Sequence, residues 1–240
     1  MVRIGRFFFK YRDFVFPVVL LGLVAASSPV LLRDDSRLDH WLDALGIAIA
    51  SAGQALRVLV IGFVYVIRGG KDKKIYAEAL VDGGLFAHCR NPLYVGNLLI
   101  VLGLIVVHSG NWLYLAALPF FVIAYLAIVL AEEEYLREKF GAEYDAYCRR
   151  VPRFIPSLRG LGRTLEGVRF DWRRVVRKEY GTPFAWMSGV LALMIWEHAA
   201  NPGHPMSARE GMVIRVVWAL LVVAYIVARV LKKTGRLGTG

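Results

Sequence analysis

The sequence predicts an all-α protein, a polytopic membrane bundle of about six transmembrane helices. Three observations support this fold class. Hydrophobic residues make up 57% of the 240 residues, and the mean hydropathy is +0.50, whereas soluble domains are usually about 45–50% apolar. Charged residues, 20% of the chain, are concentrated in a few short stretches. The long stretches between them are almost free of charge, as membrane-spanning helices are.

Six apolar stretches are candidates for the spans. A transmembrane helix needs about 20 apolar residues, and about 17–25 are tolerated. The candidates cover residues 14–32, 41–67, 93–107, 112–131, 184–198 and 212–231. The third and the fifth are short. Basic residues precede the first, but no small-residue cleavage site leads into a soluble domain, so we expect an uncleaved first helix.

The distribution of basic residues predicts the orientation. Alternate connections hold 24 Lys and Arg residues, and the other connections hold 3. The positive-inside rule places the basic side in the cytoplasm, with both termini there. The net charge of +11 therefore indicates topology and lipid headgroups, not nucleic acid. We expect a multi-pass protein of a bacterial inner membrane; the endoplasmic reticulum membrane is the alternative.

Two further features bound the chemistry. Cys89 and Cys148 both fall in predicted cytoplasmic segments, where disulfides are rare, so we expect free thiols. No Cys or His spacing typical of a metal site occurs, and we expect no metal.

Between the fourth and fifth spans, residues 157–182 are too polar to cross a membrane. Aromatic and basic residues alternate there, as in an amphipathic element lying on an anionic membrane surface; a solvated cytoplasmic helix is the alternative.

A first candidate site lies at the inner end of the third span, in residues 83–97. Pro92 is suited to begin a helix, and the free N–H groups of such a helix attract anions. His88 and Arg90 add hydrogen bonding and charge, and Gly96 permits a close approach to the helix. The alternative is that Arg90 extends to the headgroups and Tyr94 belongs to an interfacial aromatic belt.

A second candidate is the run Glu132, Glu133 and Glu134, which we place at the C-terminal end of the fourth span. Carboxylates at that position oppose the helix dipole, which is sensible if they bind a cation or a hydroxylated ligand. An acidic cap that pairs with Arg137 and Lys139 is the alternative. The third and fourth spans are joined by a few residues, so their inner ends must lie close together and can share a pocket.

Gln54 and Arg57 lie three residues apart within the second span and therefore on one helix face. An ionisable residue at membrane depth indicates a functional site by default. Binding of substrate and hydrogen bonding to neighbouring helices are both open for this pair.

At these positions, from Ala52 to Pro156, the sequence resembles the integral-membrane methyltransferases related to isoprenylcysteine carboxyl methyltransferase and phospholipid N-methyltransferases. One motif runs from Gly84 to Gly96 through Arg-Asn-Pro-Leu-Tyr. The other begins at Glu132 and closes with Val-Pro-Arg-Phe-Ile-Pro at residues 151–156. Gln54 and Arg57 are similar to a residue pair in the preceding helix of the family.

The resemblance implies the use of S-adenosylmethionine, with S-adenosylhomocysteine as product, in a cytoplasmic pocket. The implied cofactor-binding residues are Gly84, His88, Arg90, Asn91, Pro92, Tyr94, Gly96, Asn97, Glu132 and Glu133. The implied catalytic residues are Arg90, Tyr94, Glu133 and Arg153. The implied substrate-binding residues are Gln54, Arg57 and Arg153. The expected partners are membrane lipids and a lipid or lipophilic methyl acceptor carrying an amine, a thiol or a prenylcysteine carboxylate.

The sequence departs from the family where prenylcysteine-methylating members tend to carry an arginine. Residues 127–130 are Ala-Ile-Val-Leu, which weakens the expectation of a carboxylate acceptor.

We divide the chain into a methyltransferase core (1–156), an amphipathic segment (157–182) and a C-terminal helix pair (183–240). A small transporter or a lipid-binding scaffold without chemistry is the alternative function, although no internal repeat typical of transporters is evident.

Overall fold

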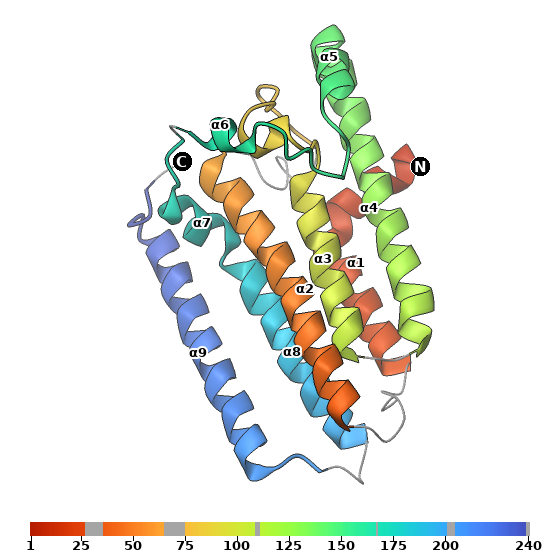
Figure 1. The fold of residues 1–240 in the computed structure, drawn as a ribbon, viewed down its shortest axis with the longest axis vertical. Helices are drawn as coiled ribbons and strands as arrows, with labels where there is room; N and C mark the ends of the chain where they lie inside the picture. Colours follow the sequence, from red (N-terminus) through yellow and green to blue (C-terminus); the bar gives the residue numbers. More distant parts are fainter. Residues whose placement is uncertain (27–35, 65–74, 109–110, 167, 201–204, 239–240) are drawn as a thin grey trace.

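The computed structural model describes residues 1–26, 36–64, 75–108, 111–166, 168–200 and 205–238. Every regular element in these ranges is a helix, which confirms the all-α class (Figure 1). The long helices are α1 (Val2–Ala26), α2 (Ser36–Phe63), α3 (Pro92–His108), α4 (Asn111–Phe140), α8 (Gly181–Ala200) and α9 (Ala208–Lys233). The short ones are the 3-10 helix η2 (Gly84–Ala87), α5 (Ala142–Arg150), α6 (Leu161–Leu165) and α7 (Trp172–Glu179).

Each of the six long helices overlaps one of the six predicted spans, and the six run along one bundle axis (Figure 1). Helix α1 begins at Val2, twelve residues before its predicted span. Within the described residues, three segments are long and apolar enough to cross a membrane: His40–Phe63, Ala116–Phe140 and Ala208–Lys233. Pro92–His108 is apolar but shorter. The chain is thus a multi-pass membrane protein, and the number of six spans stays a prediction. The predicted residues 27–32 and 65–67 lie outside the described ranges.

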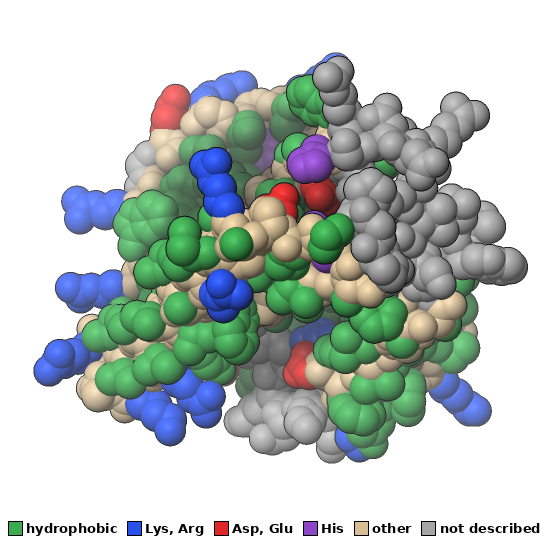
Figure 2. Space-filling model, turned by 90° about the horizontal axis from the view of Figure 1, so that it is seen from below, with side chains coloured by type: hydrophobic (Ala, Val, Ile, Leu, Met, Phe, Trp, Pro, Cys, Tyr) green, Lys and Arg blue, Asp and Glu red, His purple; other side chains and the backbone are tan. Residues whose placement is uncertain are grey.

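One end of the bundle, where α2 ends and α3 begins, holds the N-terminus, the C-terminal end of α9, η2, α5 and α6 (Figure 1). Assigning this end to the cytoplasm rests on the count of basic residues and stays a prediction. Seen from the opposite end, hydrophobic side chains cover most of the surface, and Lys and Arg side chains project mainly from its margins (Figure 2). On the sides of the bundle, large hydrophobic side chains such as Leu21 of α1 and Leu220 of α9 are exposed, which suits helices surrounded by lipid.

Helix α4 continues beyond the predicted end of its span. The helix ends at Phe140, so the glutamates do not cap a helix C-terminus as we expected; they lie about two turns before it. Leu136 and Phe140 extend the helix because they pack against Tyr144 and Tyr147 of α5. Its last turn carries basic residues, which the helix dipole favours.

Helices α2 and α3 pack closely at paired glycines. A Cβ atom added to Gly53 would lie 2.6 Å from the carbonyl oxygen of Gly96, and one added to Gly103 would lie 2.4 Å from that of Gly46. In both helices the glycines are seven residues apart, so the two antiparallel backbones stay close over two turns. Small residues of this kind drive the association of helices in membranes. This seam fixes α3 against α2.

Replacing Gly53 with leucine is expected to lower the free energy of unfolding by about 3 kcal/mol, the upper end of the usual cost of overpacking, because the clash is with backbone rather than with a flexible side chain. Thermal unfolding in detergent measures the effect. Gly22→Leu is the control, since a Cβ at Gly22 meets nothing within 4 Å. Equal unfolding temperatures for the two variants would contradict the close packing of α2 on α3.

Segment 157–182 contains α6 and α7 and is not uniformly exposed. Asp171 caps α7 by accepting a hydrogen bond from the backbone N–H of Arg174 at 2.9 Å. Val175 and Glu179 are buried, while Trp172 is exposed. Phe170 packs against Phe63, with 5.0 Å between ring centroids. This segment is therefore pinned to the end of α2, and its contact with a membrane surface stays a prediction.

Candidate functional site

Two segments that are distant in the sequence meet beside the start of α3. The backbone N–H of Arg90 donates to the carbonyl oxygen of Pro152 at 2.9 Å, and the N–H of Ser157 donates to that of His88 at 2.9 Å. The amide of Asn91 donates to the carbonyl oxygen of Arg153 at 3.2 Å. The two sequence motifs are thus held together by main-chain hydrogen bonds, which places their side chains in one site.

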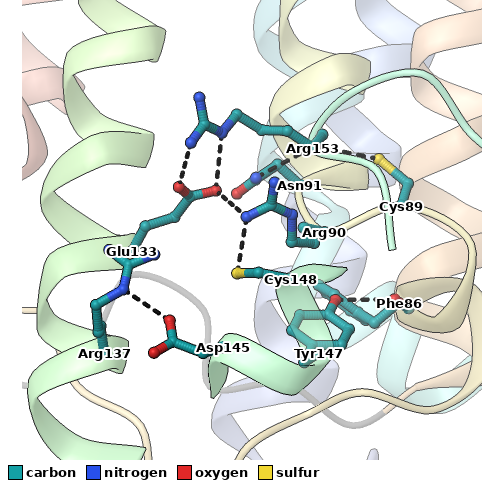
Figure 3. A network of polar contacts seen from close by, with 10 residues as sticks. All are labelled: Phe86, Cys89, Arg90, Asn91, Glu133, Arg137, Asp145, Tyr147, Cys148 and Arg153. Atoms are coloured by element: carbon teal, nitrogen blue, oxygen red, sulfur yellow. Dashed lines mark hydrogen bonds and ion pairs between the residues drawn. The ribbon is translucent and has the colours of Figure 1, made fainter. Parts of the chain in front are cut away.

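Glu133 lies at the centre of this site (Figure 3). Glu133 is buried, with only 3% of its surface exposed. Arg153 binds it in a bidentate manner, with Nε 3.0 Å from Oε1 and Nη2 2.7 Å from Oε2. Arg90 Nη1 lies 2.9 Å from the same Oε1 and 2.9 Å from the Sγ atom of Cys148. Charge-assisted bidentate pairs are among the strongest and most directional hydrogen bonds, so Glu133 fixes both guanidinium groups.

The other two glutamates point away from Glu133, because successive helical residues are about 100° apart. Glu132 Oε1 accepts a hydrogen bond from the hydroxyl of Tyr94 at 2.7 Å, and Arg12 Nη1 donates to the same hydroxyl at 3.4 Å. Glu134 pairs with Arg6 at the surface, 2.9 Å apart. Arg12 was not among the predicted site residues, since its position near the N-terminus indicated only topology.

His88 contacts the segment that follows the second motif. One ring nitrogen, Nδ1, lies 2.6 Å from the carbonyl oxygen of Ser157, and Nε2 lies 2.9 Å from the hydroxyl of Thr164. The residue is buried. Both ring nitrogens are therefore engaged in holding residues 157–164 against η2. Gly84, also predicted for the cofactor, has a φ of +58° at the start of η2 and faces Val64, which is a role in the turn.

The remaining predicted residues belong to a second polar network, centred on Arg57. Its guanidinium binds Glu179 through Nη2 to Oε1 at 2.8 Å and Nε to Oε2 at 3.1 Å. Both side chains are almost fully buried. Arg57 Nη1 also donates to Asn97 Oδ1 and, at 3.3 Å, to the carbonyl oxygen of Leu93. A Cβ added to Gly96 would lie 2.6 Å from Arg57 Cγ, so this glycine makes room for Arg57.

Gln54 joins the same network. Its amide nitrogen lies 3.3 Å from Glu179 Oε2, and its oxygen accepts a hydrogen bond from the indole N–H of Trp186 at 3.2 Å. The network links α2, α3, α7 and α8. Gln54, Arg57 and Asn97 are thus brought together with residues of the C-terminal part, and not with Glu133. Binding of substrate or cofactor by these three residues stays a prediction.

Two tyrosines of α5 border the Glu133 site. Burial raises the pKa of the Tyr144 and Tyr147 hydroxyl groups. The Tyr147 hydroxyl donates a hydrogen bond to the carbonyl oxygen of Phe86 at 2.8 Å. Both hydroxyls therefore stay protonated at neutral pH, and neither is suited to accept a proton there.

The two cysteines are both free thiols, as predicted, but their surroundings differ. Burial raises the pKa of the Cys89 thiol, so its reactive thiolate becomes populated only at a more alkaline pH than usual. Cys148 is half-buried beside Arg90. We expect N-ethylmaleimide at neutral pH to label Cys148 alone, and Cys89 only after unfolding, as measured by intact mass. Labelling of a folded Cys148→Ser variant would contradict this.

Comparison with known proteins places this chain in a family. The phospholipid methyltransferase family matches residues 44–143. The cobalt-zinc-cadmium resistance protein CzcN of Cupriavidus metallidurans is 31% identical over 163 residues, covering 65% of this chain and 68% of that protein. This chain belongs to the phospholipid methyltransferase family.

Other relatives of this family member are named as enzymes. The rat protein-S-isoprenylcysteine O-methyltransferase is 30% identical over 134 residues, covering 50% of this chain and 43% of that protein. Methanethiol S-methyltransferase 2 of Bradyrhizobium diazoefficiens is 30% identical over 125 residues, covering 52% and 47%. This phospholipid methyltransferase family member thus spans less than half of each of these two relatives. No solved structure matches it significantly.

The family match contains Arg90, Tyr94, Glu132 and Glu133 but ends before Arg153. It also excludes Arg12 and the whole segment that holds Glu179. Three of the four candidate catalytic residues therefore lie in the part shared with the family. The fourth is joined to them through the ion pair with Glu133.

Proposed function

We propose that this protein transfers the methyl group of S-adenosylmethionine to a lipid or lipophilic acceptor at the inner face of the membrane. The observation that carries the proposal is the cluster of Arg90, Glu133 and Arg153, which unites three separate segments beside the start of α3. Members of the family named as methyltransferases support the reaction class.

The residues present fit the amino-acid end of this cofactor. Two guanidinium groups against one carboxylate leave the cluster with one excess positive charge, which suits the carboxylate of the methionine moiety. The Nε atom of Arg90 is a buried donor without a hydrogen-bond partner, and such groups are costly unless a ligand satisfies them. Arg153 is 38% exposed and can therefore reach a ligand as well as Glu133.

The cofactor would supply an activated methyl group on a sulfonium, which an acceptor removes by in-line displacement. Arg90 and Arg153 would bind its carboxylate, and Glu133 would orient both arginines. Such alignment can contribute roughly 7–11 kcal/mol to catalysis at best. Both oxygens of Glu133 are bound by guanidinium groups. The Tyr94–Glu132 pair is therefore the better candidate to take a proton from an amine or thiol acceptor.

The surroundings of α4 favour an amine or thiol acceptor over a prenylcysteine carboxylate. Ala127, Ile128 and Val129, at the place of the missing arginine, are all fully buried in the core. None of them can offer a charge to a carboxylate. A cation for such an acceptor would have to come from another helix.

Calorimetry on the purified full chain tests the proposal, with S-adenosylmethionine and S-adenosylhomocysteine as titrants. We expect binding, followed by transfer of labelled methyl groups to lipid amines or thiols in a screen. A well-folded protein that binds neither compound would overturn the proposal and favour a transporter or lipid-binding scaffold. The resistance protein among the relatives raises the question of metal binding, but no group of three or more potential metal ligands occurs within the described residues.

A further inference from the structure

An apolar cavity of about 280 Å³ lies between α1, α3 and α8, apart from the polar site. Its lining comes from α1 between Leu20 and Ala25, from Leu104 of α3, and from α8 between Gly189 and Trp196. Every lining residue is apolar. The cavity has nearly twice the volume of the ~150 Å³ engineered cavity that stays dry and binds benzene.

The cavity opens towards the lipid. Leu21 is 68% exposed and Trp196 is 42% exposed, and both contribute to its lining. Water has no polar partner on such a surface and is not held there. In a membrane protein the molecules that reach this opening are hydrocarbon chains, so the chemistry of the cavity selects a chain and not a headgroup.

The cavity lies about half a bilayer core away, along the helix axes, from the polar contacts of Tyr94. Leu104 follows Tyr94 by ten residues on α3, which is about 15 Å along the helix axis. Leu20 follows Arg12 by eight residues on α1, which is about 12 Å. Both separations are close to half of the ~30 Å hydrocarbon core. A lipid whose head lies at the level of Arg12 and Tyr94 would therefore bring the end of its chain to the cavity.

We propose that the cavity binds the hydrocarbon chain of the methyl acceptor, an amphiphile of the leaflet on the Tyr94 side. That the bound amphiphile is a methyl acceptor rests on the proposed methyl transfer. The binding of its chain in the cavity does not depend on that proposal. The head of the amphiphile lies near the Arg12, Tyr94 and Glu132 contacts. The chain extends from there into the space between α1 and α8.

Photolabelling of the full chain in lipid nanodiscs tests this, with a long-chain alkylamine that carries a diazirine near its chain end. Two glycine variants are compared with the wild type. A Cβ at Gly189 meets Leu104 Cδ2 at an ordinary 3.5 Å, so the ring of Gly189→Phe fills the cavity without a backbone clash. Gly22→Phe, on α1 in open space, is the matched control.

We expect saturable labelling of residues 20–25 and 189–196 in the wild type and in Gly22→Phe. Each methylene group that the ring displaces weakens binding about fourfold, so Gly189→Phe should lose more than about tenfold. Labelling elsewhere, or labelling unchanged in Gly189→Phe, would overturn the proposal. Thermal unfolding of the same samples reports folding, and calorimetry with S-adenosylmethionine reports the proposed function separately. A wild type that is labelled in the cavity but does not bind S-adenosylmethionine would refute the proposed methyl transfer and leave the proposed chain binding standing.

Discussion

Replacing Glu133 with glutamine is expected to abolish measurable binding of S-adenosylmethionine. The carboxylate holds Arg90 and Arg153 together, and its side chain is only 5% exposed. Without its charge, two guanidinium groups face each other across a neutral amide. Removing one partner of a buried ion pair costs roughly 3–5 kcal/mol. Because Arg153 is 38% exposed, we expect the lower part of this range for the free energy of unfolding.

The neighbouring residue provides a matched control. Glu134 pairs with Arg6 at the surface, where the side chains are 41% and 56% exposed. Exposed pairs of this kind contribute about 0–1 kcal/mol, so Glu134→Gln should bind the cofactor as the wild type does. Calorimetry and thermal unfolding of both variants give the comparison. Unchanged binding in a folded Glu133→Gln variant would show that the arginines do not depend on this carboxylate.

The sequence was sufficient to locate the helices and the central site. Long apolar stretches place all six long helices, because a bilayer fixes the length and composition of its spans. The motifs identified Arg90, Glu133 and Arg153, which the structure joins directly. The short connection between the third and fourth spans was enough to predict that the start of α3 lies near the glutamates of α4, as the Tyr94–Glu132 hydrogen bond shows.

Other features could not be predicted, because they depend on packing between distant segments. The end of α4 was misplaced, since the contacts of Leu136 and Phe140 with α5 prolong the helix beyond the apolar stretch. The approach of Arg12 to Tyr94 depends on how α1 packs. The amphipathic pattern around Glu179 indicated a surface position. The fold instead buries Glu179 against Arg57, which lies 122 positions earlier in the sequence.

The pair formed by Arg57 and Glu179 leads to the second large effect. Replacing Glu179 with glutamine leaves the Arg57 guanidinium without a counter-charge among helices α2, α3 and α7. The two side chains are 3% and 2% exposed, and an uncompensated buried charge costs roughly 3–5 kcal/mol. We expect a loss of this size in the free energy of unfolding, measured by SDS titration in mixed micelles. Arg57→Met alone should also be destabilising, since Glu179 then loses both hydrogen bonds from the guanidinium group.

The double variant decides whether the pair acts as a unit. Arg57→Met with Glu179→Gln removes both charges, and Gln54 can still donate a hydrogen bond to the new amide oxygen. Replacing a whole buried pair is often nearly neutral, so the double variant should be more stable than either single variant. The exposed pair of Arg137 and Asp145, 52% and 45% exposed, is the control, and its removal should cost at most about 1 kcal/mol.

Additive losses in the Arg57 and Glu179 cycle would show that the two residues do not depend on each other. Coupling would instead show that Arg57 depends on the counter-charge that α7 supplies. The family match ends at residue 143, yet the charge that neutralises Arg57 comes from α7. Arg57 in turn donates to Leu93 and Asn97 in the first turns of α3, the helix that also carries Tyr94. A chain that ends before α7 would therefore leave a bare charge beside α3 and would also lose Trp186 and Val190 of α8 from the core that they form with Ala50 and Leu104, so we expect it not to fold even in the Arg57→Met background.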